Sequence, residues 1–116
     1  MPDKAVRKCL LEDHVAPYDD PIAFTQGQTI SLTGEAEIWD GYRWLWAVGA
    51  DGRAGWIPDN SVMVTDNTVV TVRDYSAMEL TCNRGTILHV IEETHGWAWC
   101  SAPNGFFGWV PVNKLA

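Results

Sequence analysis

The sequence predicts an all-β protein made of two similar units that follow one another along the chain. Three observations support this prediction: the chain repeats itself, apolar and polar residues alternate over short stretches, and turn-forming dipeptides separate those stretches. Alternation with a period of two is typical of a half-buried strand. The apolar period of a helix does not persist beyond about one turn anywhere in the chain.

The internal repeat extends over nearly the whole unit. Residues 44–62 align with residues 97–115 without a gap, and seven of these nineteen positions are identical. Upstream of them, residues 27–32 correspond to residues 85–90. The first unit carries five extra residues before Trp44. A repeat of this extent indicates the duplication of one structural unit.

Each repeat contains a predicted hairpin whose first strand carries two Trp residues. Because the two Trp lie two residues apart on one strand, they share a face of that strand. The pairs are Trp44 with Trp46, and Trp97 with Trp99. The dipeptides that follow, Asp51-Gly52 and Asn104-Gly105, are typical of tight β-hairpin turns.

A polar, turn-prone stretch at residues 65–68 separates the two sets of strand signals. We therefore predict one domain over residues 5–65 and a second over residues 69–116. Domains of this size bury only about 60% of the surface of their unfolded chain. Packing of one domain against the other is therefore expected.

The composition excludes several classes of function. The formal net charge is −7, and the sequence contains no cluster of Lys and Arg that could bind a nucleic acid or an anionic membrane. No apolar run approaches the roughly 20 residues of a membrane span, and the N-terminal residues do not resemble a signal peptide. We expect a cytoplasmic protein that binds neither nucleic acid nor membranes.

The Cys and His residues form no catalytic or metal-binding pattern. Three Cys without CxxC spacing predict free thiols in a reducing compartment. The three His have no metal-ligand spacing with them, and neither a nucleophile elbow nor a phosphate-binding loop occurs. We therefore predict a protein without catalytic activity, cofactor or metal.

The order of motifs in both repeats resembles the SH3 domain family. In the second repeat the motifs are Val72-Arg73-Asp74-Tyr75, Glu79-Leu80, Gly85, Gly96-Trp97 and Gly108-Trp109-Val110-Pro111-Val112-Asn113. In the first they are Tyr18, Gly27, Trp44, Gly55-Trp56-Ile57-Pro58 and Asn60. The arrangement is similar to that of short, two-unit variant SH3 proteins of bacteria. The resemblance implies two SH3-like five-stranded small barrels in tandem.

The resemblance also implies a binding site. SH3 domains hold proline-rich segments in grooves between aromatic side chains, because a polyproline II ligand loses little entropy on docking. The ligand-binding residues carried over from the family are Tyr18, Trp44, Trp56, Pro58 and Asn60 in the first repeat, and Tyr75, Trp97, Trp109, Pro111 and Asn113 in the second. Trp99 would widen the aromatic surface beside Trp97. Arg73 and Lys114 occupy two ring positions of the family.

Two main hypotheses follow from these features. In the first, the chain is a protein-interaction module whose grooves bind an extended peptide, proline-rich or basic. In the second, the Trp faces have a structural role and pack between the two units or across a homodimer. A third reading is a binder of small cations or of cell-wall fragments in open aromatic cages, because indoles and carboxylates both attract cations. The acids that border the Trp-bearing strands are Glu35, Glu37, Asp40, Glu92 and Glu93.

Overall fold

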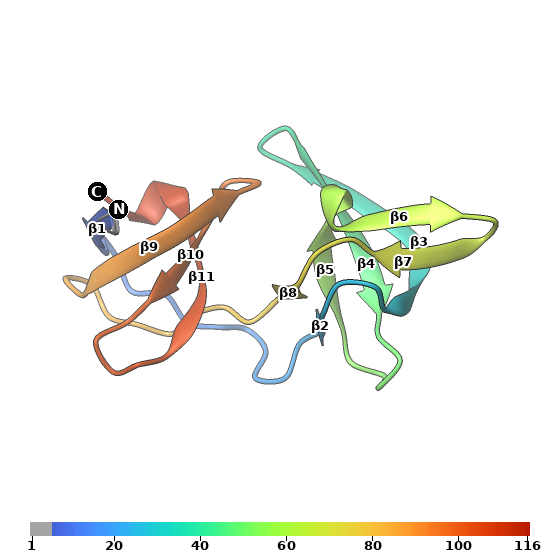
Figure 1. Cartoon of the computed structure of the whole chain (residues 1–116). Coiled ribbons are helices and arrows are strands. Elements are labelled where there is room, and N and C mark those ends of the chain that lie inside the picture. Colours follow the sequence, from blue (N-terminus) through green and yellow to red (C-terminus); the bar gives the residue numbers. More distant parts are fainter. Residues whose placement is uncertain (1–5) are drawn as a thin grey trace, which may run out of the picture. The chain divides into compact units, whose positions relative to one another are not determined.

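The computed structural model describes residues 6–116, shown in Figure 1. These residues form strands and two short 3-10 helices, which confirms the predicted all-β class. The chain folds into two compact units. We call the first the discontinuous unit, because it combines residues 6–19 with Met78–Ala116. The second, the continuous unit, consists of Asp20–Ala77.

The continuous unit is built on a five-stranded antiparallel sheet with the strand order β5-β4-β3-β7-β6. Its strands are β3 (Thr29–Trp39), β4 (Tyr42–Val48), β5 (Ala54–Pro58), β6 (Val62–Thr65) and β7 (Thr68–Thr71). The 3-10 helix η1 (Asp59–Ser61) separates β5 from β6. A small second sheet pairs β2 (Ala23–Phe24) with β8 (Tyr75–Ser76).

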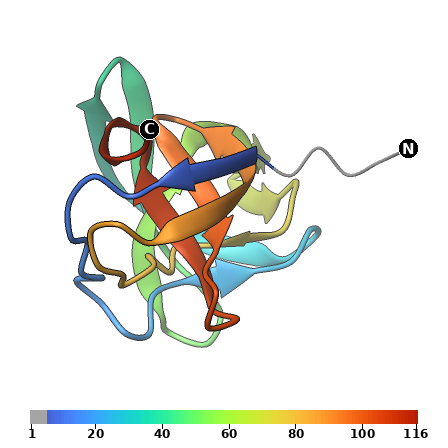
Figure 2. The same cartoon turned by 90° about the vertical axis from the view of Figure 1, so that its left-hand side faces the viewer.

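The discontinuous unit is built on a four-stranded antiparallel sheet with the strand order β1-β9-β10-β11. Its strands are β1 (Val6–Cys9), β9 (Ile87–Thr94), β10 (Trp97–Ser101) and β11 (Phe107–Pro111), and the 3-10 helix η2 (Val112–Lys114) follows them. Figure 2 shows the blue strand β1 beside the orange strand β9. After η2, Leu115 forms a bridge with Leu10, and Ala116 exchanges two backbone hydrogen bonds with Cys9.

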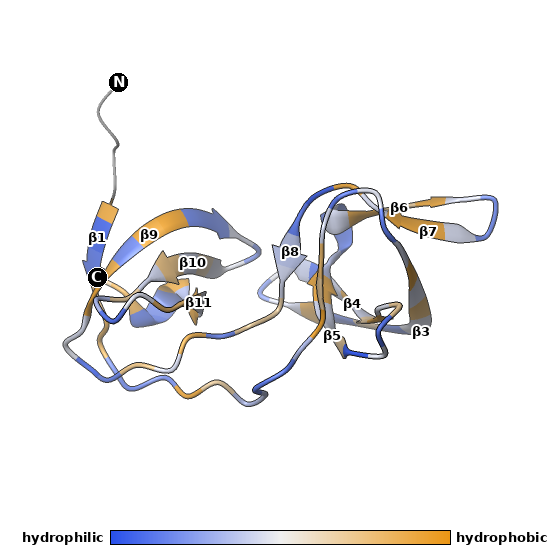
Figure 3. Ribbon diagram, turned by 60° about the horizontal axis from the view of Figure 1, so that its bottom comes forward, coloured by the Kyte–Doolittle hydropathy of each residue, from blue (hydrophilic) through white to orange (hydrophobic). Residues whose placement is uncertain are grey.

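Alternation along the strands separates the core of each unit from an outer face. In the discontinuous unit, Ala98, Cys100 and Val110 belong to a buried apolar cluster. In the continuous unit, Ala47 and Ile57 are fully buried. Figure 3 shows that the hydropathy also changes along β9, whose first residues are mainly hydrophobic and whose last residues are hydrophilic.

The predicted hairpins at the two Trp strands are confirmed. Gly52 lies between β4 and β5, and Gly105 lies between β10 and β11. Both glycines have a positive φ, of 86° and 89°, which residues with a Cβ atom rarely adopt. The Asp-Gly and Asn-Gly dipeptides therefore mark real turns in the fold.

The stretch at residues 65–68 is also a hairpin turn, where we predicted a domain boundary. Asp66 and Asn67 both have a positive φ, of 49° and 64°. This is the conformation that a two-residue hairpin turn requires, and Asp and Asn tolerate it better than most residues. The turn joins β6 directly to β7, and Thr65 pairs with Thr68.

The compact units therefore differ from the domains predicted at residues 5–65 and 69–116. β1 begins the first repeat but pairs with β9 of the second, whereas β7 begins the second repeat but pairs with β3 of the first. The two strands are equivalent, because Lys8 pairs with Leu88 and Val69 pairs with Ile30. Leu88 and Ile30 match in the repeat, so the repeats have exchanged their first strands.

The tandem SH3-like organisation is retained, although the sheets of residues 6–116 do not close into full barrels. No helix within residues 6–116 is long and apolar enough to cross a membrane.

Candidate functional site

The outer face of the discontinuous unit carries a row of large side chains. Alternate residues of a strand point to opposite faces of the sheet, so this row lies opposite the buried Ala98 and Cys100. We call it the aromatic row; its members, from β10 and β11, are Trp97, Trp99, Phe107, Trp109 and Pro111.

The aromatic row is held together by ring contacts. The Trp99 ring meets the Trp109 ring edge to face, with centroids 5.2 Å apart and an interplanar angle of 63°. On its other side Trp99 stacks on Phe107 at 6.4 Å and 19°. Trp97 and Trp99 are half-buried, whereas Phe107 is 51% exposed. The row therefore presents apolar ring surface to solvent at several points.

An acidic side chain borders the aromatic row. Glu92 of β9 is exposed and lies opposite Trp99 in the register of β9 and β10. A carboxylate beside an indole attracts a cation by two mechanisms, charge and the ring quadrupole. This edge of the row is therefore suited to a basic group.

A polar network closes the end of the row at Trp97. The His14 ring is buried and meets the Trp97 ring edge to face at 6.0 Å. His14 Nε2 lies 2.7 Å from Glu79 Oε1, and His14 Nδ1 lies 3.0 Å from Lys114 Nζ. Because an ammonium group only donates, Nδ1 accepts from Lys114 and the proton on Nε2 is donated to Glu79.

Lys114 connects this network to the segment that follows β1. Its Nζ lies 3.5 Å from Glu12 Oε1 and 3.5 Å from the backbone oxygen of Asp13. The resemblance to SH3 domains implies a tyrosine at the position of Lys114, so a cation stands here in its place. The network fills this end of the row with charge-assisted contacts instead of phenol rings.

In the continuous unit, the Trp39 side chain packs on the equivalent face. Trp44 pairs with Pro58 across β4 and β5, and only 5% of Trp44 is exposed. Trp39, at the end of the long strand β3, packs on Trp44 at 5.5 Å and edge to face on Trp56 at 5.4 Å. The indole N–H of Trp39 donates to Glu37 Oε2 at 2.9 Å. Trp39 thus packs over Trp44 and against Trp56, and Trp39 itself is 36% exposed.

The Trp pair deeper in this face repeats the geometry of the other unit. Trp46 meets Trp56 edge to face at 5.1 Å and 74°, like the pair of Trp99 and Trp109. The two repeats therefore build the same indole pair on β4–β5 and on β10–β11. They differ in what lies beside it: Trp39 in one unit and Phe107 in the other.

The strand exchange redistributes the predicted ligand-binding residues. Tyr75 lies with the Trp44 face, because its hydroxyl donates to the backbone oxygen of Trp56 at 3.2 Å and its ring packs on Phe24 at 5.6 Å. Our assignment of Tyr75 to the Trp97 groove is therefore wrong. Tyr18, which we assigned to the Trp44 groove, belongs to the discontinuous unit and is 57% exposed.

The other predicted residues lie beside one another in each unit as expected. Trp56, Pro58 and Asn60 follow Trp44 along β5 and η1, and Asn60 is exposed. Pro111 ends β11 beside Trp97, and the exposed Asn113 lies in η2. The tight turn after each Pro places the Asn at the end of the indole face.

The sequence comparison missed His14 as the counterpart of Tyr75. Residues 10–14 and 71–75 share Asp at the fourth position, and both carboxylates perform the same task. Asp13 Oδ1 accepts from the backbone N–H of Arg84 at 2.7 Å, and Asp74 Oδ1 accepts from that of Gln26 at 2.9 Å. This shared Asp was the signal that could have placed His14 at the tyrosine position.

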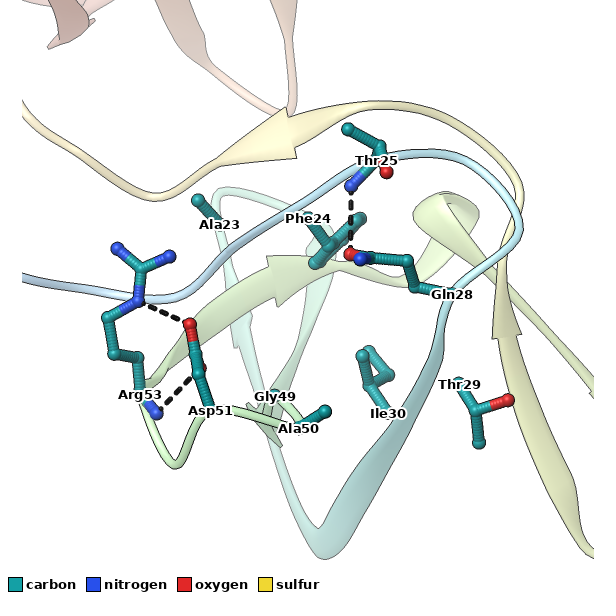
Figure 4. A pocket seen from close by; sticks show the side chains of 10 residues that line it. All are labelled: Ala23, Phe24, Thr25, Gln28, Thr29, Ile30, Gly49, Ala50, Asp51 and Arg53. Atoms are coloured by element: carbon teal, nitrogen blue, oxygen red, sulfur yellow. Dashed lines mark hydrogen bonds and ion pairs between the residues drawn. The ribbon is translucent and has the colours of Figure 1, made fainter.

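A hollow of about 660 Å³ lies elsewhere in the continuous unit, shown in Figure 4. Phe24 and Ile30 form part of its apolar lining, and Arg53 and Asp51 flank it. The backbone N–H and guanidinium of Arg53 lower the pKa of Asp51. None of the predicted groove residues lines this hollow.

The three Cys are free thiols, as predicted. Burial raises the pKa of the Cys100 thiol to about 11 and also raises the pKa of Cys82. Thiols with raised pKa values are poor nucleophiles and metal ligands at neutral pH. Among residues 6–116 there is no group of three or more His, Cys, Asp or Glu side chains that could hold a metal ion.

Comparison with known proteins identifies the family of the two repeats. The family model of the variant SH3 domain matches twice, at residues 10–64 and at residues 68–116. No curated protein and no solved structure matches the chain. Since the two matches cover most of the sequence, the chain belongs to the variant SH3 domain family.

Proposed function

We propose that the chain is a protein-interaction module that binds an extended peptide along the aromatic row of the discontinuous unit. SH3-type domains generally mediate protein–protein interactions and are typically non-catalytic. The observation that carries the proposal is the difference between the two Trp faces. The outer Trp of each strand differs: Trp97 is half-buried, whereas the equivalent Trp44 is only 5% exposed and packs against Trp39. The inner Trp of each strand, Trp99 or Trp46, is half-buried in both units, and of these two only Trp99 lies beside an exposed Phe ring.

The chemistry of the row favours a proline-containing peptide with a basic side chain. Proline rings of an extended peptide would pack on Trp97 and Trp99, and the ligand would lose little entropy because polyproline II is already extended. A Lys or Arg of the ligand would lie over Trp99 next to the Glu92 carboxylate. The exposed Asn113 would donate to a ligand carbonyl at the other end.

The Trp face of the continuous unit has a structural role in this proposal. Four indoles of this unit contact one another in a chain, with centroid distances between 5.1 Å and 5.5 Å; they are Trp39, Trp44, Trp46 and Trp56. Aromatic pairs of this kind stabilise a fold by about 0.5–1.5 kcal/mol beyond their buried area. The structural hypothesis therefore applies to this face.

We place the protein in the cytoplasm, because its thiols are free and a reducing compartment keeps them so.

An NMR titration tests the proposal directly. The amide and indole N–H signals of the labelled protein are recorded while a proline-rich peptide with flanking Arg residues is added. The signals of Trp97, Trp99 and Phe107 should shift, and those of Trp39 and Trp44 should not. In the variant W97A, affinity should fall by about tenfold or more, the usual effect of losing an aromatic anchor.

The matched control is F106A, which alters an exposed ring of the same hairpin outside the row. It should bind the peptide as the wild type does. Signals that stay unchanged with proline-rich, basic and acidic peptides alike would contradict the proposal. Shifts confined to the Trp39 region would show that the wrong face was chosen.

A further inference from the structure

β1 and β7 are equivalent strands, and each completes the sheet of the other repeat. The residues that follow them are also equivalent: the backbone oxygens of Leu10 and Thr71 accept from Gly85 and Gly27, each at 2.8 Å. Two strands and two acceptor sheets can be combined in two ways. In the exchanged pairing seen here, each strand joins the other repeat. In a consecutive pairing, each would remain with its own.

Leu10 and Thr71 match different acceptor sheets. Leu10 is fully buried in the apolar cluster of the discontinuous unit, together with Leu80 and Leu88. Thr71 is also buried, but its hydroxyl donates to the backbone oxygen of Thr25 at 2.6 Å and accepts from the N–H of Gln28 at 2.8 Å.

The discontinuous unit does not need a hydroxyl at this place. The position that matches Thr25 is Asn83, and its backbone oxygen already accepts from the Thr86 hydroxyl at 2.7 Å. In a consecutive pairing, Leu10 would lie against Thr25 and Gln28. The backbone oxygen of Thr25 and the backbone N–H of Gln28 would then lose the Thr71 hydroxyl that they bond here. Thr71 would replace a leucine in the apolar cluster. Both changes are unfavourable, because buried polar groups need partners and cavities cost stability.

His14 and Tyr75 show the same preference. His14 contacts Glu79 and Lys114, and the matching positions of the continuous unit hold Pro21 and Ser61, which offer neither a carboxylate nor an ammonium group. Tyr75 packs on Phe24, whereas the matching position of the discontinuous unit is Cys82. Each ring therefore finds its contacts only in the exchanged pairing.

We propose that Leu10, His14, Thr71 and Tyr75 select the exchanged pairing of β1 and β7, and so determine which ring faces Trp97. The selection works by matching each strand to one acceptor sheet and mismatching it to the other. In the consecutive pairing, Tyr75 would stand beside Trp97 and His14 beside Trp44. This inference does not depend on any ligand of the aromatic row.

Disulfide trapping distinguishes the two pairings in the intact chain. Arg7 and His89 are register partners in the exchanged pairing, and Ser31 matches His89 in the other repeat. Antiparallel partners lie about 4.5–5.5 Å apart between Cα atoms, within the range of a disulfide. In a background with C9V, C82A and C100A, the pair R7C and H89C should oxidise rapidly. The control pair R7C and S31C should not.

A set of strand-swap variants tests the role of the four side chains. Each half-swap, L10T with H14Y or T71L with Y75H, mismatches one strand and should lower the melting temperature. The full swap of all four residues should recover melting temperature relative to the half-swaps, because the consecutive pairing becomes the matched one. In the full swap, rapid disulfide formation should also shift from the pair R7C and H89C to the pair R7C and S31C.

Two outcomes would overturn the proposal. One is a full swap whose melting temperature is no higher than the sum of the two half-swap losses predicts; a full swap that does not fold counts as the same outcome. The other is a full swap that keeps the 7–89 disulfide, which would show that the short connections around residues 15–21 and 76–79 decide the pairing. Cross-strand NOEs between Arg7 and His89 in the wild type test the exchanged pairing without any substitution. NOEs between Arg7 and Ser31 would contradict it.

Discussion

Gly108 lies directly against the backbone of Leu80. A Cβ atom added to Gly108 would stand 2.6 Å from the Leu80 amide nitrogen and 2.8 Å from the carbonyl carbon of Glu79. This approach brings β11 to the segment that supplies Glu79, and the backbone of Leu80 donates to the Trp109 oxygen at 3.0 Å. The glycine therefore positions both the indole pair and the acceptor of His14.

The variant G108A should consequently lose about 2–3 kcal/mol of stability, because the added methyl group meets backbone atoms that cannot move alone. The matched control is G55A at the equivalent position. There the new Cβ would meet the Ile22 Cγ2 atom at 3.0 Å and the Ala77 Cβ at 3.4 Å, and the Ile22 side chain can adjust. Thermal unfolding followed by Trp fluorescence should show the larger shift for G108A. Equal shifts would contradict the argument.

The variant E79A should destabilise the discontinuous unit by about 1–3 kcal/mol, since a buried ring nitrogen of His14 loses its acceptor. Chemical denaturation measures this loss. The control E35A removes an exposed carboxylate from the other unit and should change stability by less than about 0.5 kcal/mol. A negligible effect of E79A would contradict the role of Glu79 as the acceptor of the His14 ring nitrogen.

The variant W39A should expose Trp44, which is buried beneath it. Acrylamide quenching of Trp fluorescence should increase and the emission maximum should move to longer wavelength. The control I38A changes the neighbouring residue of β3, whose side chain is 71% exposed and points to the opposite face of the strand. If W39A leaves quenching unchanged beyond the loss of one indole, Trp39 does not cover the face.

The stability of the protein should fall at alkaline pH in a manner that depends on Cys100. Burial raises the pKa of this thiol from 9.0 to about 11 in the folded state. Between these values the folded chain retains a proton that the unfolded chain releases, so the contribution is complete below pH 9 and is lost as pH rises towards about 11. The variant C100A should show a shallower decrease of unfolding free energy over this range. Parallel curves for both proteins would contradict the assigned pKa.

Several features of the fold could be predicted from local sequence alone. The hairpin at Asp51-Gly52 and that at Asn104-Gly105 follow from turn chemistry, and the shared face of Trp97 and Trp99 follows from the period of a strand. The repeat itself indicated equivalent sheets. Each of these features depends on residues that are neighbours in the chain.

The choice of partners for β1 and β7 could not be read in the same way. Both strands fit the SH3 pattern, and the Asp66-Asn67 turn resembles a linker as much as a hairpin. The free energies that separate the two pairings arise from contacts between residues about 50 to 100 positions apart, such as His14 with Glu79 and Lys114. Local patterns do not contain these contacts. For this reason the sequence assigns Tyr75 to the wrong Trp face and does not reveal the role of His14.

By itself, then, the sequence determined the all-β class, the duplication and the aromatic faces, because these depend on alternation, turn residues and internal similarity. Only the tertiary structure decided which strand completes which sheet, which ring stands beside Trp97, and which of the two Trp faces Trp39 covers. The physical reason is that equivalent strands compete for equivalent sheets, and the outcome depends on buried packing and hydrogen bonds that exist only after the chain has folded.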